Sequence, residues 1–193
     1  MKLRLLLLLL FLPCICLAQQ VFLGLGYERH SYSNNNSVPK ICLTAGYGLT
    51  RWCVMGAYTE YSNHYALVAY GNNPFYGYHE HFILYGVYNE CHPVTLAFPK
   101  FYLLDIYTIL RAGLHHRMYR FDEDNLPAEF SIFYPNSCKP YLTGGWGAAI
   151  NPSKNVGFFY EKTYSTLSTY RPANSNETHK PLRRFGIIIH FRP

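Results

Sequence analysis

The closing stretch of the chain, RRFGIIIHFR (183–192), alternates with a period of two residues. On an extended chain, Gly186, Ile188 and His190 fall on one face. The opposite face is apolar throughout: Phe185, Ile187, Ile189 and Phe191. This pattern is typical of a β-strand that forms a wall between lipid and a filled interior.

Seven more segments alternate in the same way and are predicted as strands. With the last one, the predicted strands are 21–30, 40–49, 52–61, 80–90, 101–116, 139–150, 155–165 and 183–192. For 80–90, either face could be the outer one. No run of 18 apolar residues follows residue 18, so no membrane helix is expected. Only 15% of the residues are charged, whereas 19 are Tyr and 13 are Phe, which suits a barrel with aromatic belts.

The predicted connections alternate between long and short. They span 31–39, 50–51, 62–79, 91–100, 117–138, 151–154 and 166–182. Barrels of this class have short periplasmic turns and longer outer loops, and an even strand count places both termini in the periplasm. Because the odd-numbered connections are the long ones, the sequence predicts an all-β, eight-stranded antiparallel up-and-down transmembrane β-barrel in a Gram-negative outer membrane.

The N-terminus has the features of a secretory signal peptide. Lys2 and Arg4 precede an apolar run over 5–12, and Cys16-Leu17-Ala18 places small residues at the usual cleavage positions. The run is too short to cross a bilayer core of about 30 Å. We therefore expect a signal peptide at 1–18 and one barrel domain at 19–193.

Charge and cysteine content exclude several classes of function. Without Lys2 and Arg4, the 17 basic residues become 15, against 11 acidic ones, and no Lys/Arg run accompanies a nucleic-acid recognition motif. The remaining cysteines have no zinc-site spacing and are too few for a disulfide scaffold: Cys42, Cys53, Cys91 and Cys138. We expect separate thiols packed in strands, and neither a cofactor nor a metal.

Three stretches resemble a known family. The hairpin GGWGAAINPSKNVGFFYEKTYS (144–165), the strand LDIYTILRAGL (104–114) and the closing RFGIIIHF (184–191) are similar to small outer-membrane barrels of the OmpA/OmpX/OmpW-like and Bacteroidota types. The resemblance implies that the barrel-assembly machinery reads the final aromatic, Phe191. Here Arg192 and Pro193 follow it, whereas many relatives stop at the aromatic. The family has no shared catalytic residues.

Five charged residues are predicted to face the interior: Glu28, Glu60, Asp105, Arg111 and Glu161. An Arg that faces lipid near the midplane costs about 2–4 kcal/mol, so the inward orientation is favoured. Eight strands enclose a space that side chains can fill. We interpret these charges as a hydrogen-bonded plug; a proton or solute path is the alternative.

Basic residues gather at the predicted outer strand ends: Arg29, Lys40, Arg117, Arg120, Lys139, Lys180, Arg183 and Arg184. Lipopolysaccharide fills the outer leaflet of such membranes, and its phosphates match the guanidinium fork of Arg. From this group we predict a lipid-phosphate rim formed by Arg117, Arg183 and Arg184, with ordinary loop solvation as the alternative.

The sequence therefore predicts a non-enzymatic, monomeric outer-membrane barrel with a structural or surface-interaction role and outer-membrane lipids as partners. A lipid A-modifying enzyme or a narrow solute channel is the alternative. In the enzyme reading, Ser62 lies beside His64 and Glu60, but Glu60 stands where a deacylase has its His, which leaves Ser62 without a base. A lipocalin-type carrier would need an early Gly-x-Trp, which Gly24-Leu25-Gly26 lacks.

Overall fold

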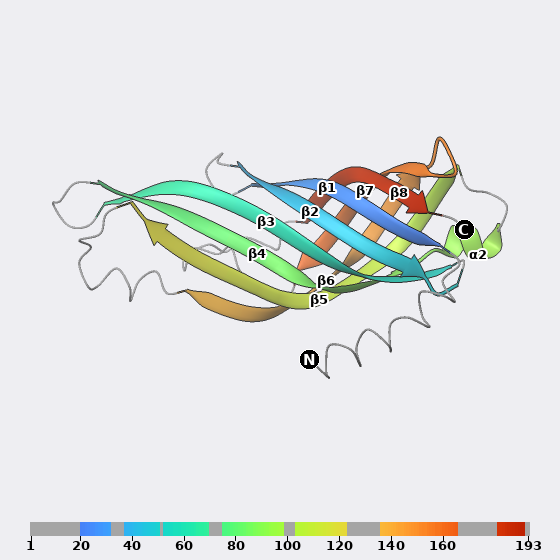
Figure 1. Ribbon diagram of the computed structural model, residues 1–193, viewed down its shortest axis with the longest axis horizontal. Helices are drawn as coiled ribbons and strands as arrows, with labels where there is room; N and C mark the ends of the chain where they lie inside the picture. The colour runs from blue at the N-terminus through green and yellow to red at the C-terminus, as the bar shows by residue number, and fades with distance from the viewer. Residues whose placement is uncertain are drawn as a thin grey trace.

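A computed structural model describes residues 20–31, 37–50, 52–69, 75–98, 103–122, 136–165 and 181–191. Successive strands pair antiparallel and β1 pairs with β8, which closes the barrel (Figure 1). The strands are β1 (Val21–Ser31), β2 (Ser37–Gly48), β3 (Cys53–Ala69), β4 (Phe75–Cys91), β5 (Leu104–Phe121), β6 (Ser137–Ile150), β7 (Val156–Ser165) and β8 (Leu182–Phe191). The predicted eight-stranded up-and-down barrel is confirmed. The expected signal peptide lies outside the described residues.

The barrel wall separates an apolar exterior from a mixed interior. Along β1, Leu23 and Leu25 are about half exposed, whereas Phe22 and Glu28 are buried. The sequence left undecided which face of β4 is the outer one. In the structure, Phe82 and Tyr88 point inward and Val87 points outward. No helix among the described residues is long and apolar enough to cross a membrane. Most of the exposed large apolar side chains are carried by the strands, as lipid contact requires.

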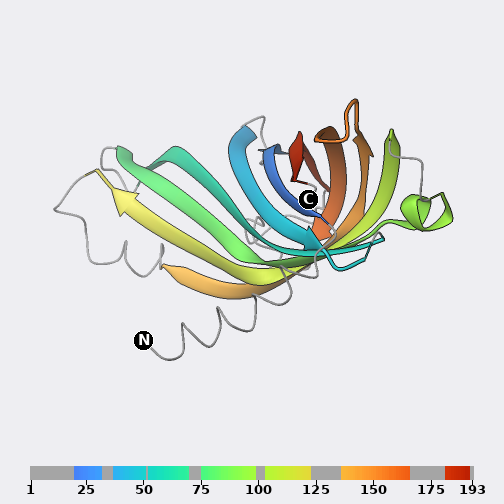
Figure 2. The ribbon, with the colours of Figure 1, turned by 45° about the vertical axis from the view of Figure 1, so that its right-hand side comes forward.

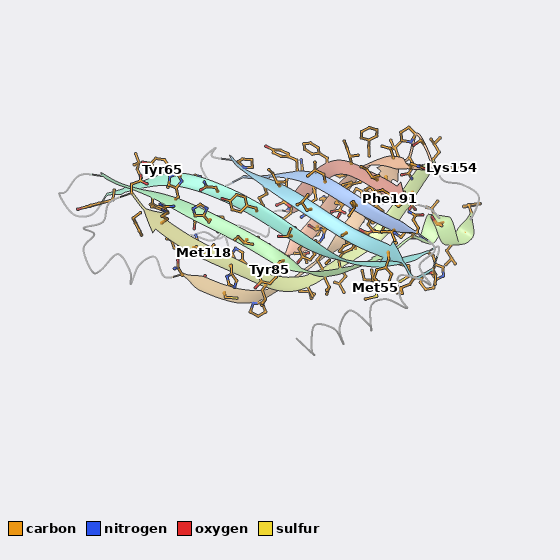
Figure 3. The ribbon with its side chains drawn as sticks, in the orientation of Figure 1. Met55, Tyr65, Tyr85, Met118, Lys154 and Phe191 are labelled. Carbon is orange, nitrogen blue, oxygen red and sulfur yellow. The ribbon has the colours of Figure 1, made fainter. Side chains whose placement is uncertain are left out.

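Short connections gather at one end of the barrel. Figure 3 shows Met55, Lys154 and Phe191 toward the end that holds α2 (Pro93–Ala97), with Tyr65 at the opposite end. In the short connection between β2 and β3, the Thr50 hydroxyl accepts a hydrogen bond from the Cys53 N–H at 3.0 Å, which stabilises the turn. The short-turn end is the periplasmic end in barrels of this class.

The outer ends of β3, β4 and β5 extend beyond the predicted strands. The predicted loop at 62–79 is wrong: β3 continues to Ala69 and β4 begins at Phe75, and this ribbon extends past its neighbours with β5 (Figure 2). Side-chain pairs along the hairpin explain the extension, since the Tyr61 hydroxyl lies 3.0 Å from His81 Nδ1 and the Tyr65 and His79 rings lie 5.0 Å apart. Such cross-strand pairs are a main source of stability in sheets.

The periplasmic connection 91–100 contains the short helix α2. Pro93 occupies its first turn, where the missing N–H costs no helical hydrogen bond. The sequence predicted a plain connection here. A helix of five residues is too short to give a periodic signal.

Candidate functional site in the barrel interior and at the outer rim

Arg184 lies at the centre of an ion-paired cluster inside the barrel. Its Nη2 is 3.3 Å from Glu28 Oε2 and also contacts Glu60 Oε1, while its Nη1 is 3.4 Å from Glu161 Oε2. The side chain is 4% exposed. One guanidinium therefore joins carboxylates from β1, β3 and β7. Its N–H donors point in several directions within one plane, which the compact ammonium of Lys could not reproduce.

Arg111 extends the cluster on β5. Its Nη2 lies 2.5 Å from Glu161 Oε2, and the Tyr107 hydroxyl donates to Glu161 Oε1 at 3.1 Å. The Arg111 guanidinium also sits 5.6 Å from the centre of the Tyr58 ring. Glu161 is thus held by two cations and one hydroxyl, as a buried carboxylate requires.

Lys40 completes this group, which we call the interior network: Glu28, Lys40, Glu60, Arg111, Glu161 and Arg184. Lys40 Nζ lies 3.0 Å from Glu28 Oε1. The network holds three carboxylates and three cations, so its formal charges balance. Its members come from six of the eight strands, β4 and β6 excepted.

Buried aromatic residues occupy part of the interior, where glycines leave room for them. A Cβ on Gly147 would overlap the Tyr107 ring, and one on Gly46 would overlap both Phe22 and the Tyr88 hydroxyl. Tyr58 and Tyr141 pack edge to face at 6.2 Å. These aromatic side chains occupy interior space, which is narrow in a barrel of eight strands.

Asp105 lies apart from the other four predicted interior charges. It sits at the periplasmic start of β5, where His92 Nδ1 is 2.6 Å from its Oδ2 and Thr95 donates to its Oδ1 at 3.5 Å. His92 Nε2 lies 3.3 Å from Glu90 Oε2. Burial alone would lower the pKa of His92, but Asp105 and Glu90 outweigh it and raise the pKa to about 9. These contacts tie α2 to the barrel.

The predicted rim position of Arg184 is wrong, since its side chain lies inside the barrel. The reason is the period of two: Phe185 faces lipid, so Arg184 faces the opposite way. Lys40, which the sequence grouped with the outer basic residues, is buried for the same reason beside the outward Ile41.

Arg117 also lies on the inward face of its strand, at the outer end. Its guanidinium contacts Glu80 and sits 5.3 Å from the Phe82 ring and 5.1 Å from the Tyr119 ring. The side chain is 32% exposed. Arg117 therefore has an acidic partner within the barrel, which the rim prediction did not foresee.

Arg183 is the predicted rim residue that faces outward. It is exposed near the start of β8 and lies directly opposite Lys162 of β7. Lys162 Nζ stacks over the Tyr164 ring at 5.8 Å. The alternation of the strand is the signal that identifies Lys162, because a residue that follows the inward Glu161 must face outward.

Ser62, the candidate serine of the lipid A enzyme alternative, lies on the inward face of β3. Ser62 is 2% exposed, and its hydroxyl has no hydrogen-bond partner among the described residues. Glu60, two residues before it, contacts Arg184. In the same described ranges, no group of three His, Cys, Asp or Glu side chains could hold a metal ion.

No protein-family model matches the sequence, and no curated protein sequence matches it significantly. Solved structures do match the fold. OprG from Pseudomonas aeruginosa aligns with a TM-score of 0.53 and 12% identity over 91% of this chain and 97% of that one. Neisserial surface protein A aligns with a TM-score of 0.52 and 14% identity over 89% and 96%.

A third match is Ail, the attachment invasion locus protein of Yersinia pestis, crystallised with the heparin analogue sucrose octasulfate. It aligns with a TM-score of 0.51 and 13% identity over 89% of this chain and 97% of that one. At such identities the likeness concerns the fold. Together with the apolar exterior, it shows that this chain has the architecture of an outer-membrane β-barrel protein.

Proposed function

We propose that this chain is a non-enzymatic integral outer-membrane protein whose lumen is plugged and whose outer surface contacts lipopolysaccharide, in a structural or surface-interaction role. The observation that carries the proposal is the contact of buried Arg184 with Glu28, Glu60 and Glu161. A solute path would need these groups to be hydrated. Here they neutralise one another across the barrel.

Ion conductance tests the plug against the narrow-channel alternative. The purified protein, inserted in a planar lipid bilayer, should show no steady conductance steps, and an open porin inserted in the same way serves as the positive control. Reproducible single-channel steps from the wild-type barrel would contradict the plug and favour the channel.

The outer contact is argued from Lys162 and Arg183. Like charges directly opposite one another on a sheet are unfavourable, and this pair faces outward near the outer ends of β7 and β8. A phosphate between them would offset the repulsion and accept charge-assisted hydrogen bonds. Lipopolysaccharide provides phosphates at this level of the membrane.

Co-purification of lipopolysaccharide with the barrel tests this contact. Replacing both residues, as K162Q/R183Q, should reduce the bound lipopolysaccharide several-fold without loss of fold, and high salt should have a similar effect on the wild type. Lys154→Gln, in an exposed turn at the opposite end, is the matched control and should change nothing. Equal binding by all three proteins would leave Lys162 and Arg183 as ordinary solvated residues.

The non-enzymatic part of the proposal rests on the burial of Ser62 and the engagement of Glu60 by Arg184. Mass spectra of lipid A from cells that express the wild-type protein should equal those from cells with an empty vector. A new acylated or deacylated species that disappears in Ser62→Ala would establish the enzyme instead.

Two partner proposals follow from β8 and the closed sheet. Phe191 is half exposed at the end of β8, where an assembly factor could read it. β1 pairs with β8, so the closed barrel has no terminal strand to which a second copy could add, and we propose a monomer. Light scattering from the detergent-solubilised protein would reveal a dimer if this is wrong.

A further inference from the structure

Two cysteines that lie far apart in the sequence meet at the periplasmic end of the barrel. Cys53 begins β3 and Cys91 ends β4, and the register places them directly opposite one another. Opposed residues of a strand pair point to the same face. Both thiols are partly buried, and Cys53 Sγ lies 3.4 Å from Asn89 Nδ2, which donates to it.

The backbone hydrogen bonds show which kind of strand pair the two cysteines form. The next pair along the ladder is Trp52 and His92, and His92 N donates to Trp52 O at 2.8 Å. Because hydrogen-bonded and non-hydrogen-bonded pairs alternate, Cys53 and Cys91 form a non-hydrogen-bonded pair. This is the closer kind, with Cα atoms about 4.5 Å apart.

That separation suits a disulfide. Disulfide-linked residues have Cα atoms about 4.4–6.8 Å apart, with Cβ atoms that face one another. The other two cysteines do not compete: Cys42 is buried in the interior opposite Gly26 and Glu60, and Cys138 lies opposite His116. The structure leaves one pair in position to be joined.

The compartment favours oxidation. The pair lies at the short-turn end, which faces the periplasm, and disulfides form and persist there. We propose that Cys53 and Cys91 form a cross-strand disulfide in the protein assembled in the outer membrane. The two thiols lose two protons and two electrons and form the S–S bond. The disulfide of a periplasmic thiol oxidoreductase accepts them and becomes two thiols.

This bond would close the base of the β3–β4 hairpin. Its position directly before His92 would also fix the start of the connection that holds α2. By closing a loop of residues 53–91, it would restrict the unfolded chain and favour the native register of these strands.

Thiol counting on the mature full-length protein tests the proposal. Protein taken from outer membranes is denatured without reductant and labelled with a maleimide polymer that shifts the band once per free thiol. The wild type should bind two labels, and four after reduction. The C42S/C138S variant, which retains the proposed pair and leaves β3 and β4 unchanged, should bind none before reduction and two after it.

Two labels on unreduced C42S/C138S would overturn the proposal. Cys53→Ser provides a further check, because three thiols should then be free. A disulfide that persists in Cys53→Ser would assign the oxidation to a different pairing and would equally overturn the proposal. A reductant-sensitive dimer of the wild-type protein on the gel would do the same. Peptide mass spectrometry of the unreduced wild type should yield a fragment that joins Cys53 to Cys91.

Discussion

Arg183 and Arg184 are adjacent in sequence and lie on opposite sides of the barrel wall. Arg183 is exposed opposite Lys162, whereas Arg184 is buried and contacts Glu28, Glu60 and Glu161. A strand turns each successive side chain to the other face, so one residue separates a lipid-facing environment from a network of carboxylates. The same substitution at the two positions should therefore have different consequences.

Arg111→Ala should destabilise the barrel by about 3–5 kcal/mol, because it leaves a buried carboxylate, Glu161, without its 2.5 Å partner. Arg184 still contacts Glu161, which favours the lower end of that range. Urea unfolding from lipid vesicles measures the change. Arg120→Ala, at an exposed position of the same strand, should cost less than about 0.5 kcal/mol. Equal stability of the two variants would contradict the role of Arg111 in the interior network.

Gly147→Ala should cost about 1–3 kcal/mol through overpacking, because the added methyl group overlaps the Tyr107 ring. Gly144→Ala is the matched control on the same strand. Its Cβ would meet Leu110 Cδ1 at an ordinary 3.6 Å. In urea, Gly147→Ala should unfold at a lower concentration than Gly144→Ala. The reverse order would mean that the Tyr107 ring does not occupy the space over Gly147.

The anchor of α2 should weaken at high pH. Asp105 and Glu90 raise the pKa of His92 from 6.5 to about 9, although burial opposes them. A raised folded-state pKa gives stability that is complete below about pH 6.5 and is lost as the pH rises through about 9. An NMR titration of the His92 ring in nanodiscs measures the pKa directly. Asp105→Asn should move it downward, and an unchanged value would show that Asp105 does not hold the imidazolium.

The alternating pattern of the sequence predicted all eight strands, because a wall between lipid and a filled interior imposes a period of two. It also predicted that Glu28, Glu60, Arg111 and Glu161 point inward, and the structure brings these four together. The contacts between them were beyond prediction. They depend on register and barrel closure, which join β1 to β8 across most of the chain.

The misplaced residues have physical causes. Arg184 and Lys40 were assigned to the outer group of basic residues because they lie near strand ends. The alternation in their own strands already predicted that their side chains face inward. The outer halves of β3 and β4 are rich in His and Tyr, which resembles loop composition. The pairs formed by Tyr61, Tyr65, His79 and His81 stabilise the hairpin only once the strands are paired.

The most direct measurement compares Arg184→Gln with Arg183→Gln by urea unfolding from lipid vesicles. Gln at 184 removes the cation shared by three buried carboxylates, so we expect a loss of about 3 kcal/mol or more. Gln at 183, on the exposed face, should cost less than about 0.5 kcal/mol. If the two variants unfold at the same urea concentration, Arg184 does not hold the lumen together and the plugged-barrel account is wrong.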